Sequence, residues 1–291
     1  MRIPAMSLGV LAALTLVSPA VAEAPITPQG NFGGGALVSP PADIFGAGNA
    51  VVALRALPGG RLEIEATVRA RCAGGDISES AKIAANGSFS AEGTVTQQPT
   101  PSTKITTSYE MSGRFTDASS AGGTISATIK RDVEGRQTTC KSGTVSFAAR
   151  RPTSGVGKAG AVGAARYYGT TAQKSTGPNR PIVLRISADG KRITRALFSY
   201  SVTCSDDKVA IGVEAPRTNI AINSKGRVSD RDRTTQTEGE AVVKIDDRFT
   251  AELGAKGARG TFALSDVTTD RASGRTLQTC RTGTIRWRAS R

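Results

Sequence analysis

The sequence predicts an all-β protein made of two tandem antiparallel repeats, each folded as a β-sandwich or a small barrel and each closed by one disulfide. Three observations support this fold class. Apolar and polar residues alternate over long runs, the two halves repeat the same landmarks in the same order, and each half holds one pair of cysteines. No segment shows a helical apolar stripe, so we expect six to eight strands in each repeat.

The alternation is clearest in the segment from Leu62 to Cys72. Apolar side chains occupy every second position there, and glutamate, threonine or arginine occupies nearly every position between them. Successive side chains of a strand point to opposite faces, so this pattern indicates a half-buried strand. The segment from Ala196 to Cys204 follows the same alternation. Both strands are therefore expected to turn their cysteine toward the core.

The two halves are most alike near their ends. Residues 140–151 and 280–291 share a cysteine, a glycine, a threonine, an alanine and a final arginine at equivalent positions. Short matching segments earlier in each half also follow one another in the same order. The first of them is a proposed match of Phe32-Gly33 to Tyr168-Gly169. Repeated landmarks in a fixed order predict an internal duplication.

Four cysteines allow three disulfide pairings. The duplication selects the symmetric one, Cys72 with Cys140 and Cys204 with Cys280. Closing loops of this length constrains the unfolded chain by about 4 kcal/mol per disulfide in the chain-entropy description.

The last strand of each repeat contains a change of phase. In this strand the apolar residues alternate at odd positions, as with Val145 in the first repeat and Trp287 in the second. The preceding cysteine is at an even position, so in a regular strand it would point to the opposite face. A glycine lies between them in both copies, at Gly143 and Gly283. We expect a β-bulge at this glycine and place Trp287 in the core.

Four segments follow from these landmarks. Residues 1–22 have the charged, apolar and small-residue order of a cleavable signal peptide. Residues 23–151 form the first repeat and 166–291 the second, and 152–165 read as a flexible Gly/Ala/Ser-rich linker. No later apolar run is long enough to span a bilayer, so the expected location is extracellular or periplasmic.

The ending C-x-x-G-x-x-x-[FW]-x-A, together with an upstream glycine turn and a cysteine midway, resembles a group of exported bacterial disulfide-containing β-proteins. The pattern starts at Cys140 in the first repeat and at Cys280 in the second. This resemblance implies export and a β fold. It implies no activity, and no catalytic or binding residue follows from it.

Several kinds of chemistry are excluded by composition. The chain has no histidine, which removes Ser-His-Asp catalysis and histidine-ligated zinc. Cysteines held in disulfides cannot act as nucleophiles, and no phosphate-binding glycine loop is present. We therefore expect no cofactor and no metal.

Paired carboxylates offer one catalytic alternative. Glu63 and Glu65 share one face of a strand about 6.6 Å apart, within the range that carboxylate-dependent hydrolases use. A solvated face with cross-strand ion pairs explains the same two residues more simply. A structural or inhibitor-like role is a third alternative for the chain as a whole.

Net charge differs strongly between the two repeats. Residues 152–291 hold 24 basic and 13 acidic side chains, against 13 and 10 in residues 25–151. Arg286 and Arg288 share the outward face of the last strand, with Arg281 and Arg291 near its ends. Guanidinium groups bind phosphate and sulfate bidentately, so this ladder predicts binding of anionic polysaccharide, acidic lipid headgroups or another polyanion, without sequence-specific nucleic-acid recognition. The competing explanation is a basic surface that serves only solubility.

Overall fold

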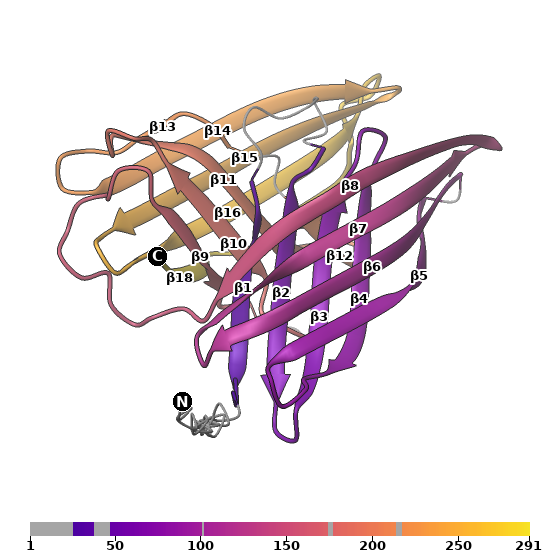
Figure 1. Ribbon diagram of the computed structural model, residues 1–291. Coiled ribbons are helices and arrows are strands. Elements are labelled where there is room, and N and C mark those ends of the chain that lie inside the picture. The colour runs from indigo at the N-terminus through magenta and orange to yellow at the C-terminus, as the bar shows by residue number, and fades with distance from the viewer. Residues whose placement is uncertain (1–25, 38–46, 101, 174–176, 214–216) are drawn as a thin grey trace, which may run out of the picture.

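The computed structural model describes residues 26–37, 47–100, 102–173, 177–213 and 217–291, so the predicted signal peptide lies outside the described part. The described residues form two curved antiparallel sheets that lie side by side and contain no helix (Figure 1). The predicted all-β fold with two tandem units is confirmed.

Residues of the first repeat form an eight-stranded sheet in the order β4-β3-β2-β1-β8-β7-β6-β5. The sheet curls until its two edge strands, β4 and β5, approach each other without backbone pairing, so the barrel is nearly closed. The strands are β1 (Gly30–Ala36), β2 (Ala50–Leu57), β3 (Arg61–Arg69), β4 (Gly74–Lys82), β5 (Ser88–Thr100), β6 (Thr103–Asp117), β7 (Ser120–Val133) and β8 (Arg136–Arg150).

The second sheet follows the same order, β12-β11-β10-β9-β18-β16-β15-β14. Pairing of β17 with both β11 and β16 closes six of its strands into a ring, and the short β13 adds to β11. The strands are β9 (Arg166–Thr171), β10 (Pro181–Ile186), β11 (Arg192–Cys204), β12 (Val209–Val213), β13 (Ile220–Ala221), β14 (Arg227–Glu238), β15 (Ala241–Leu253), β16 (Gly257–Asp270), β17 (Thr276–Arg281) and β18 (Ile285–Ser290).

This sheet therefore has ten strands, more than the expected six to eight. The reason is that the counterpart of β8 is broken into β17 and β18, and that β13 has no counterpart in the first sheet.

Both predicted disulfides are present, Cys72–Cys140 and Cys204–Cys280. Cys204 is buried, as its strand parity predicted, and its partner Cys280 is buried as well. Cys72 is only partly buried, because β3 ends at Arg69 and the cysteine lies in the bend that follows. Both cysteines nevertheless contact their strand's apolar side as predicted: Cys204 is buried, and Cys72 packs against the first core from its partly buried position.

The predicted phase change is a bulge capped by a hydroxyl group in both barrels. Gly143 has a φ of 67° and Gly283 a φ of 62°, a backbone conformation that favours glycine. Ser142 Oγ accepts a hydrogen bond from the unpaired β7 amide opposite the bulge at 2.9 Å and donates one to the Gly143 carbonyl at 2.7 Å. Thr282 makes the same two contacts in the second barrel.

The first strands of the two units correspond with an offset of one residue from the predicted alignment. Ala149 pairs with Gly34, and its counterpart Ala289 pairs with Gly169. Phe32 therefore corresponds to Tyr167 rather than to Tyr168. Tyr167 is fully buried, and its hydroxyl donates to the Gly254 carbonyl at 2.9 Å.

Each barrel has its own apolar core. Phe32 and Phe115 meet edge to face in the first, with ring centroids 5.1 Å apart. In the second, Trp287 is 2% exposed and stacks on Phe249 at 5.5 Å. The core position predicted for Trp287 is confirmed.

The predicted linker, residues 152–165, follows the surface of the second barrel. Its Thr153 amide donates to Ser290 Oγ at 2.9 Å, and Ser290 Oγ donates to the Arg151 carbonyl at 2.9 Å. Further along, Ala159 forms an isolated bridge with Gly254. Backbone hydrogen bonds thus hold this segment against the second barrel despite its small side chains.

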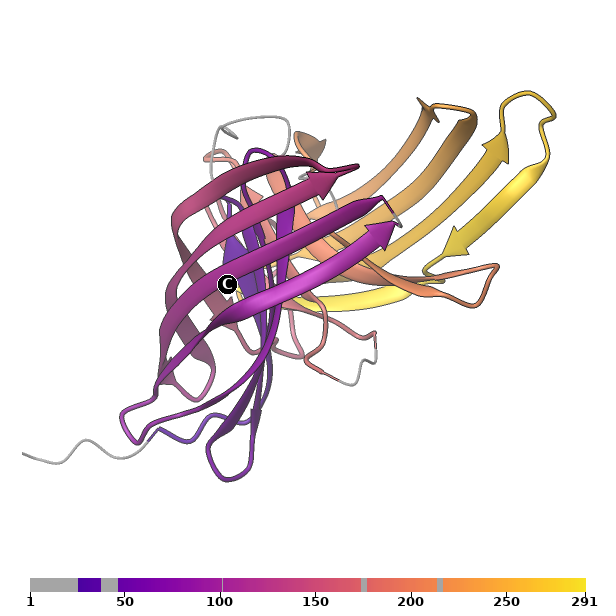
Figure 2. The same cartoon turned by 90° about the vertical axis from the view of Figure 1, so that its right-hand side faces the viewer.

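The two barrels pack back to back through β1 and β2 on one side and β9, β10 and β11 on the other (Figure 1). From the side, the long strands β5–β8 and β14–β16 diverge from this junction (Figure 2). The junction contains a third apolar cluster separate from both cores, made of Leu37, Val51, Tyr168, Val183 and Leu197. Tyr168 faces this cluster, which explains its burial.

Gly33 allows the close approach of the barrels. A Cβ atom added at Gly33 of β1 would lie 1.9 Å from the carbonyl oxygen of Gly169 in β9. Backbone cannot yield in the way that a flexible side chain can, so any side chain at Gly33 must push the two sheets apart.

We predict that Gly33→Ala destabilises the protein by about 1–3 kcal/mol, in the range of overpacked interiors. The matched control is Gly155→Ala, where an added Cβ meets no atom within 4 Å. Urea unfolding followed by Trp287 fluorescence measures both changes. An effect of Gly33→Ala no larger than that of the control would contradict the close contact.

Candidate anion-binding face of the second barrel

One face of the second sheet is strongly basic over four neighbouring strands. On β14, β15, β16 and β18 the residues of one parity point away from the barrel interior, and this outer face is rich in arginine. Asp246 and Glu252 are the only acidic residues of that parity within the described strands. The basic residues of the face on these four strands are Arg227, Arg231, Arg233, Lys244, Arg248, Arg259, Arg286 and Arg288, and Arg281 at the end of β17 adjoins them.

Arg286 and Arg288 are exposed at the end of this face, as predicted. Arg288 lies opposite Arg259 on β16, and the Arg259 guanidinium pairs with Glu252 at 2.7 Å. Neither Arg286 nor Arg288 has an acidic partner among the described residues. Their guanidinium groups are therefore available to an anion from outside.

The other acid of the face is also neutralised. Arg231 Nε donates to Asp246 Oδ1 at 2.8 Å, and Arg233 lies 3.4 Å from Asp246 Oδ2. Hydrogen bonding to Arg231 lowers the pKa of Asp246 to about 2. The carboxylate remains charged at neutral pH but is held by arginine, so it does little to repel an approaching anion.

Acidic residues of the same strands point the other way. Asp230 and Asp247 have the inward parity and both pair with the buried Arg217. Burial raises the pKa of Asp247, and the nearby Asp232 and Asp230 carboxylates add to that increase against the opposing effect of Arg217. On β14, β15 and β16 most acidic residues therefore have the inward parity, and the basic residues have the outward one.

Three of the four predicted anion-binding residues share this face. Arg281 lies opposite Ser265 on β16 with the outward parity of Arg286 and Arg288. Arg291 follows Ser290 with the inward parity of Trp287, and its amide donates to the Lys256 carbonyl at the end of the barrel. It therefore lies away from the outer face of the sheet.

Sequence reasoning missed the arginines of β14 and β15. Their signal was present in the run Arg227-Val-Ser-Asp-Arg-Asp-Arg233, which alternates charge with the period of a strand. Recognising it required knowing that only two strands, β15 and β16, separate β14 from β18, and only the sheet order supplies that placement.

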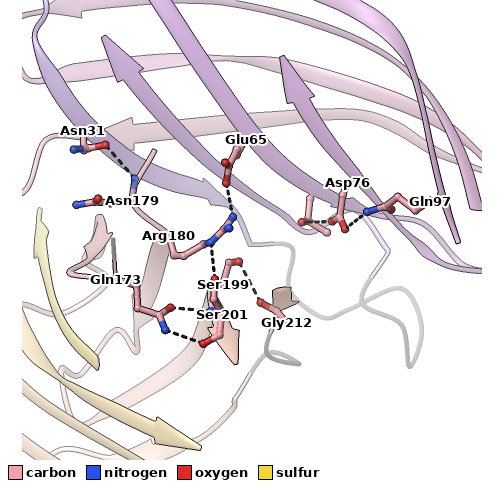
Figure 3. A network of polar contacts seen from close by, with 11 residues as sticks. Asn31, Glu65, Asp76, Gln97, Gln173, Asn179, Arg180, Ser199, Ser201 and Gly212 are labelled. Atoms are coloured by element: carbon pink, nitrogen blue, oxygen red, sulfur yellow. Dashed lines mark hydrogen bonds and ion pairs between the residues drawn. The ribbon is translucent and has the colours of Figure 1, made fainter. Parts of the chain in front are cut away.

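A second candidate site is the cleft between the barrels, beside the unpaired edges of β4 and β5 (Figure 3). Arg180 projects from the second barrel and forms an ion pair with Glu65 of the first. Its Nε also donates to Ser201 Oγ at 3.3 Å, and the Gln173 side chain holds the Ser201 backbone by two hydrogen bonds of 2.8 Å. The cleft thus joins the barrels by a polar network.

Polar side chains on the far side of the cleft also have hydrogen-bond partners. Asp76 accepts hydrogen bonds from Thr67 Oγ1 at 2.5 Å and from Gln97 Nε2 at 2.9 Å, which ties β4 to β5 where no backbone pairing exists. The cavity between these groups is only about 160 Å³, and ligand sites usually exceed about 300 Å³. We interpret this cleft as a structural contact.

The predicted carboxylate pair lies beside this cleft. Glu63 accepts from Arg55 Nε at 2.6 Å, and Glu65 pairs with Arg180. Each carboxylate therefore has an arginine partner. The Glu63 pair is the expected cross-strand ion pair, whereas Glu65 pairs with an arginine of the other barrel.

No protein-family model and no curated protein sequence matches the chain. Among solved structures, the chain is similar to a protein from Nitrosomonas europaea that carries the provisional name AttH. The similarity covers 95% of this chain and 99% of that one, at 7% identity and a TM-score of 0.23. We draw nothing from a similarity at this level. Within the described residues, no helix has the length and hydropathy needed to cross a bilayer.

We predict that Glu65→Gln destabilises the protein by about 1–3 kcal/mol, because Arg180 is only 10% exposed and would lose its counter-charge. Glu63→Gln is the control, since its partner Arg55 is more exposed and the loss should stay within about 1 kcal/mol. Thermal unfolding compares the two variants. Equal losses would show that Glu65 does not join the barrels as described.

Proposed function

We propose that this protein is an exported, non-catalytic binding module whose second barrel attaches to an anionic polymer or surface. One observation carries the proposal: arginines outnumber acids on the outer face of β14–β18, and the acids present there already have arginine partners. A surface of this kind attracts polyanions from a distance.

Export is supported by the signal-like order of residues 1–22 and by the use of all four cysteines in disulfides, which persist in oxidising compartments. The resemblance of both repeat ends to exported bacterial β-proteins points the same way. A shared strand order supports the inferred duplication. If the units were duplicated, only the second has acquired the basic face, because Ser146 and Ala148 occupy the positions of Arg286 and Arg288.

The shape of the face favours a polymer over a single small anion. Neighbouring strands lie about 4.8 Å apart, and alternate residues along a strand about 6.6 Å apart. Arginines at such spacing form a grid that can contact several charged groups of one chain. Envelope polysaccharide, acidic lipid headgroups and nucleic acid all present repeated charges of this kind.

We predict that Arg286→Glu combined with Arg288→Glu weakens binding to heparin or to vesicles containing phosphatidylglycerol at least tenfold at low salt. The logarithmic salt dependence should also become shallower by about two ion equivalents, because two contacts are lost. Titrations at several salt concentrations measure both effects.

The control for this test is Arg61→Glu combined with Arg136→Glu, which changes the net charge equally on exposed positions of the first barrel. Binding that falls equally in both double variants would mean that total charge, rather than this face, attracts the polymer. Unchanged binding after reversal of Arg286 and Arg288 would exclude them from the contact.

A further inference from the structure

A row of three arginines crosses the second barrel on the side that faces the first. Arg166 of β9 pairs in register with Arg185 of β10, which pairs with Arg195 of β11. Residues opposite each other on neighbouring strands project to the same face. The next row along these strands, Tyr168, Val183 and Leu197, is the apolar layer of the junction, so the arginine row lies at its border.

The innermost member of the row is buried without compensation. Arg195 is only 4% exposed, and its Nη1 has no hydrogen-bond partner. Burial lowers the pKa of Arg195, and the positive charge of Arg185 lowers it further. Among the described residues no carboxylate pairs with any of the three arginines.

Such an arrangement opposes folding. A buried guanidinium without a counter-charge loses its hydration, and a like charge on the neighbouring strand adds repulsion. Natural proteins retain groups of this kind mainly where function requires them. An oxyanion bound to the row would supply both the missing hydrogen-bond acceptor and the missing charge.

The exposed end of the row, Arg166, borders a cavity between the barrels. Exposure falls from Arg166, which is exposed, through the half-buried Arg185 to the buried Arg195. Arg166 and Tyr168 line one wall of a cavity of about 420 Å³ between the barrels, and Ala36 and Leu37 contribute apolar lining from the first barrel. This volume lies within the usual range for small-molecule sites.

We propose that the Arg166–Arg185–Arg195 row binds the phosphate of a small organic phosphate monoester, whose apolar part occupies the adjoining cavity. A dianionic phosphate group suits several converging arginines better than a carboxylate does, because it carries more charge and three acceptor oxygens. The site is distinct from the polymer-binding face, from which it differs in burial, in strands and in the size of its ligand.

Hexyl phosphate is a suitable probe, and inorganic phosphate serves as the comparison ligand because it lacks an apolar group. At about 100 times its dissociation constant, hexyl phosphate should raise the Tm of the full chain by roughly 5–10 °C. Inorganic phosphate should need at least a tenfold higher concentration to give the same rise in Tm. Equal protection by both would overturn the assignment of the cavity, and protection by neither would overturn the site.

Arg195→Met separates a ligand-binding role from a structural one. If the charge awaits a ligand, the variant keeps or raises the Tm of the ligand-free protein and loses the shift caused by hexyl phosphate. A lower ligand-free Tm together with an unchanged ligand shift would overturn the proposal.

Two further variants complete the test. Arg185→Gln changes a half-buried position and should also remove most of the shift, which keeps the proposal testable if Arg195→Met does not fold. Arg288→Gln removes one charge from the outer face and should retain the full shift. Loss of the shift in Arg288→Gln would assign the effect to general electrostatics and overturn the discrete site.

Discussion

Back-to-back packing of β1 and β2 against β9, β10 and β11 is the constraint on which the rest of the structure depends. Gly33 brings the two backbones so close that no side chain fits between them. On either side of this contact the barrels share an apolar layer that includes Val51 and Leu197. Both faces of β10 and much of β11 are consequently buried, one in the barrel core and the other in the junction.

This packing also determines where charge can lie. Most of the wall of the second barrel that meets the first is covered, so the solvated arginines are concentrated on the opposite wall, from β14 to β18. Acids such as Asp247 lie on the inner side of the same strands with Arg217 as their partner. At the border of the junction, Arg195 is buried with no carboxylate partner among the described residues, and its Nη1 has no hydrogen-bond partner. The two proposed anion sites thus follow from one arrangement of the barrels.

Much of the fold could be predicted because its signals are local. Alternation predicted β3, whose inward residues are buried as expected, and the repeated glycine predicted the bulges at Gly143 and Gly283. The disulfides followed from symmetry between the halves. Barrel closure could not be predicted, since it depends on β17 pairing with two strands distant in sequence.

The errors have a common physical origin in contacts between distant strands. The burial of Tyr168 could not be predicted, because the sequence does not reveal that the outside of β9 packs on another barrel. Arg291 was grouped with Arg286 by proximity in sequence, although the parity of a strand separates them. For the candidate site, the ladder of Arg286 and Arg288 was visible in one strand, whereas its extension to Arg231 and Arg248 required the order of the sheet.

Hydrogen exchange of the full chain, measured at increasing urea, tests most directly whether the two barrels behave as one cooperative body. Amides of β1 and β9 should exchange only through an opening that also exposes both cores, so their exchange free energies should converge on one global value. Exchange of β9–β11 through an opening that leaves β1 and β2 protected would contradict this account, because the barrels would then be independent units that merely touch.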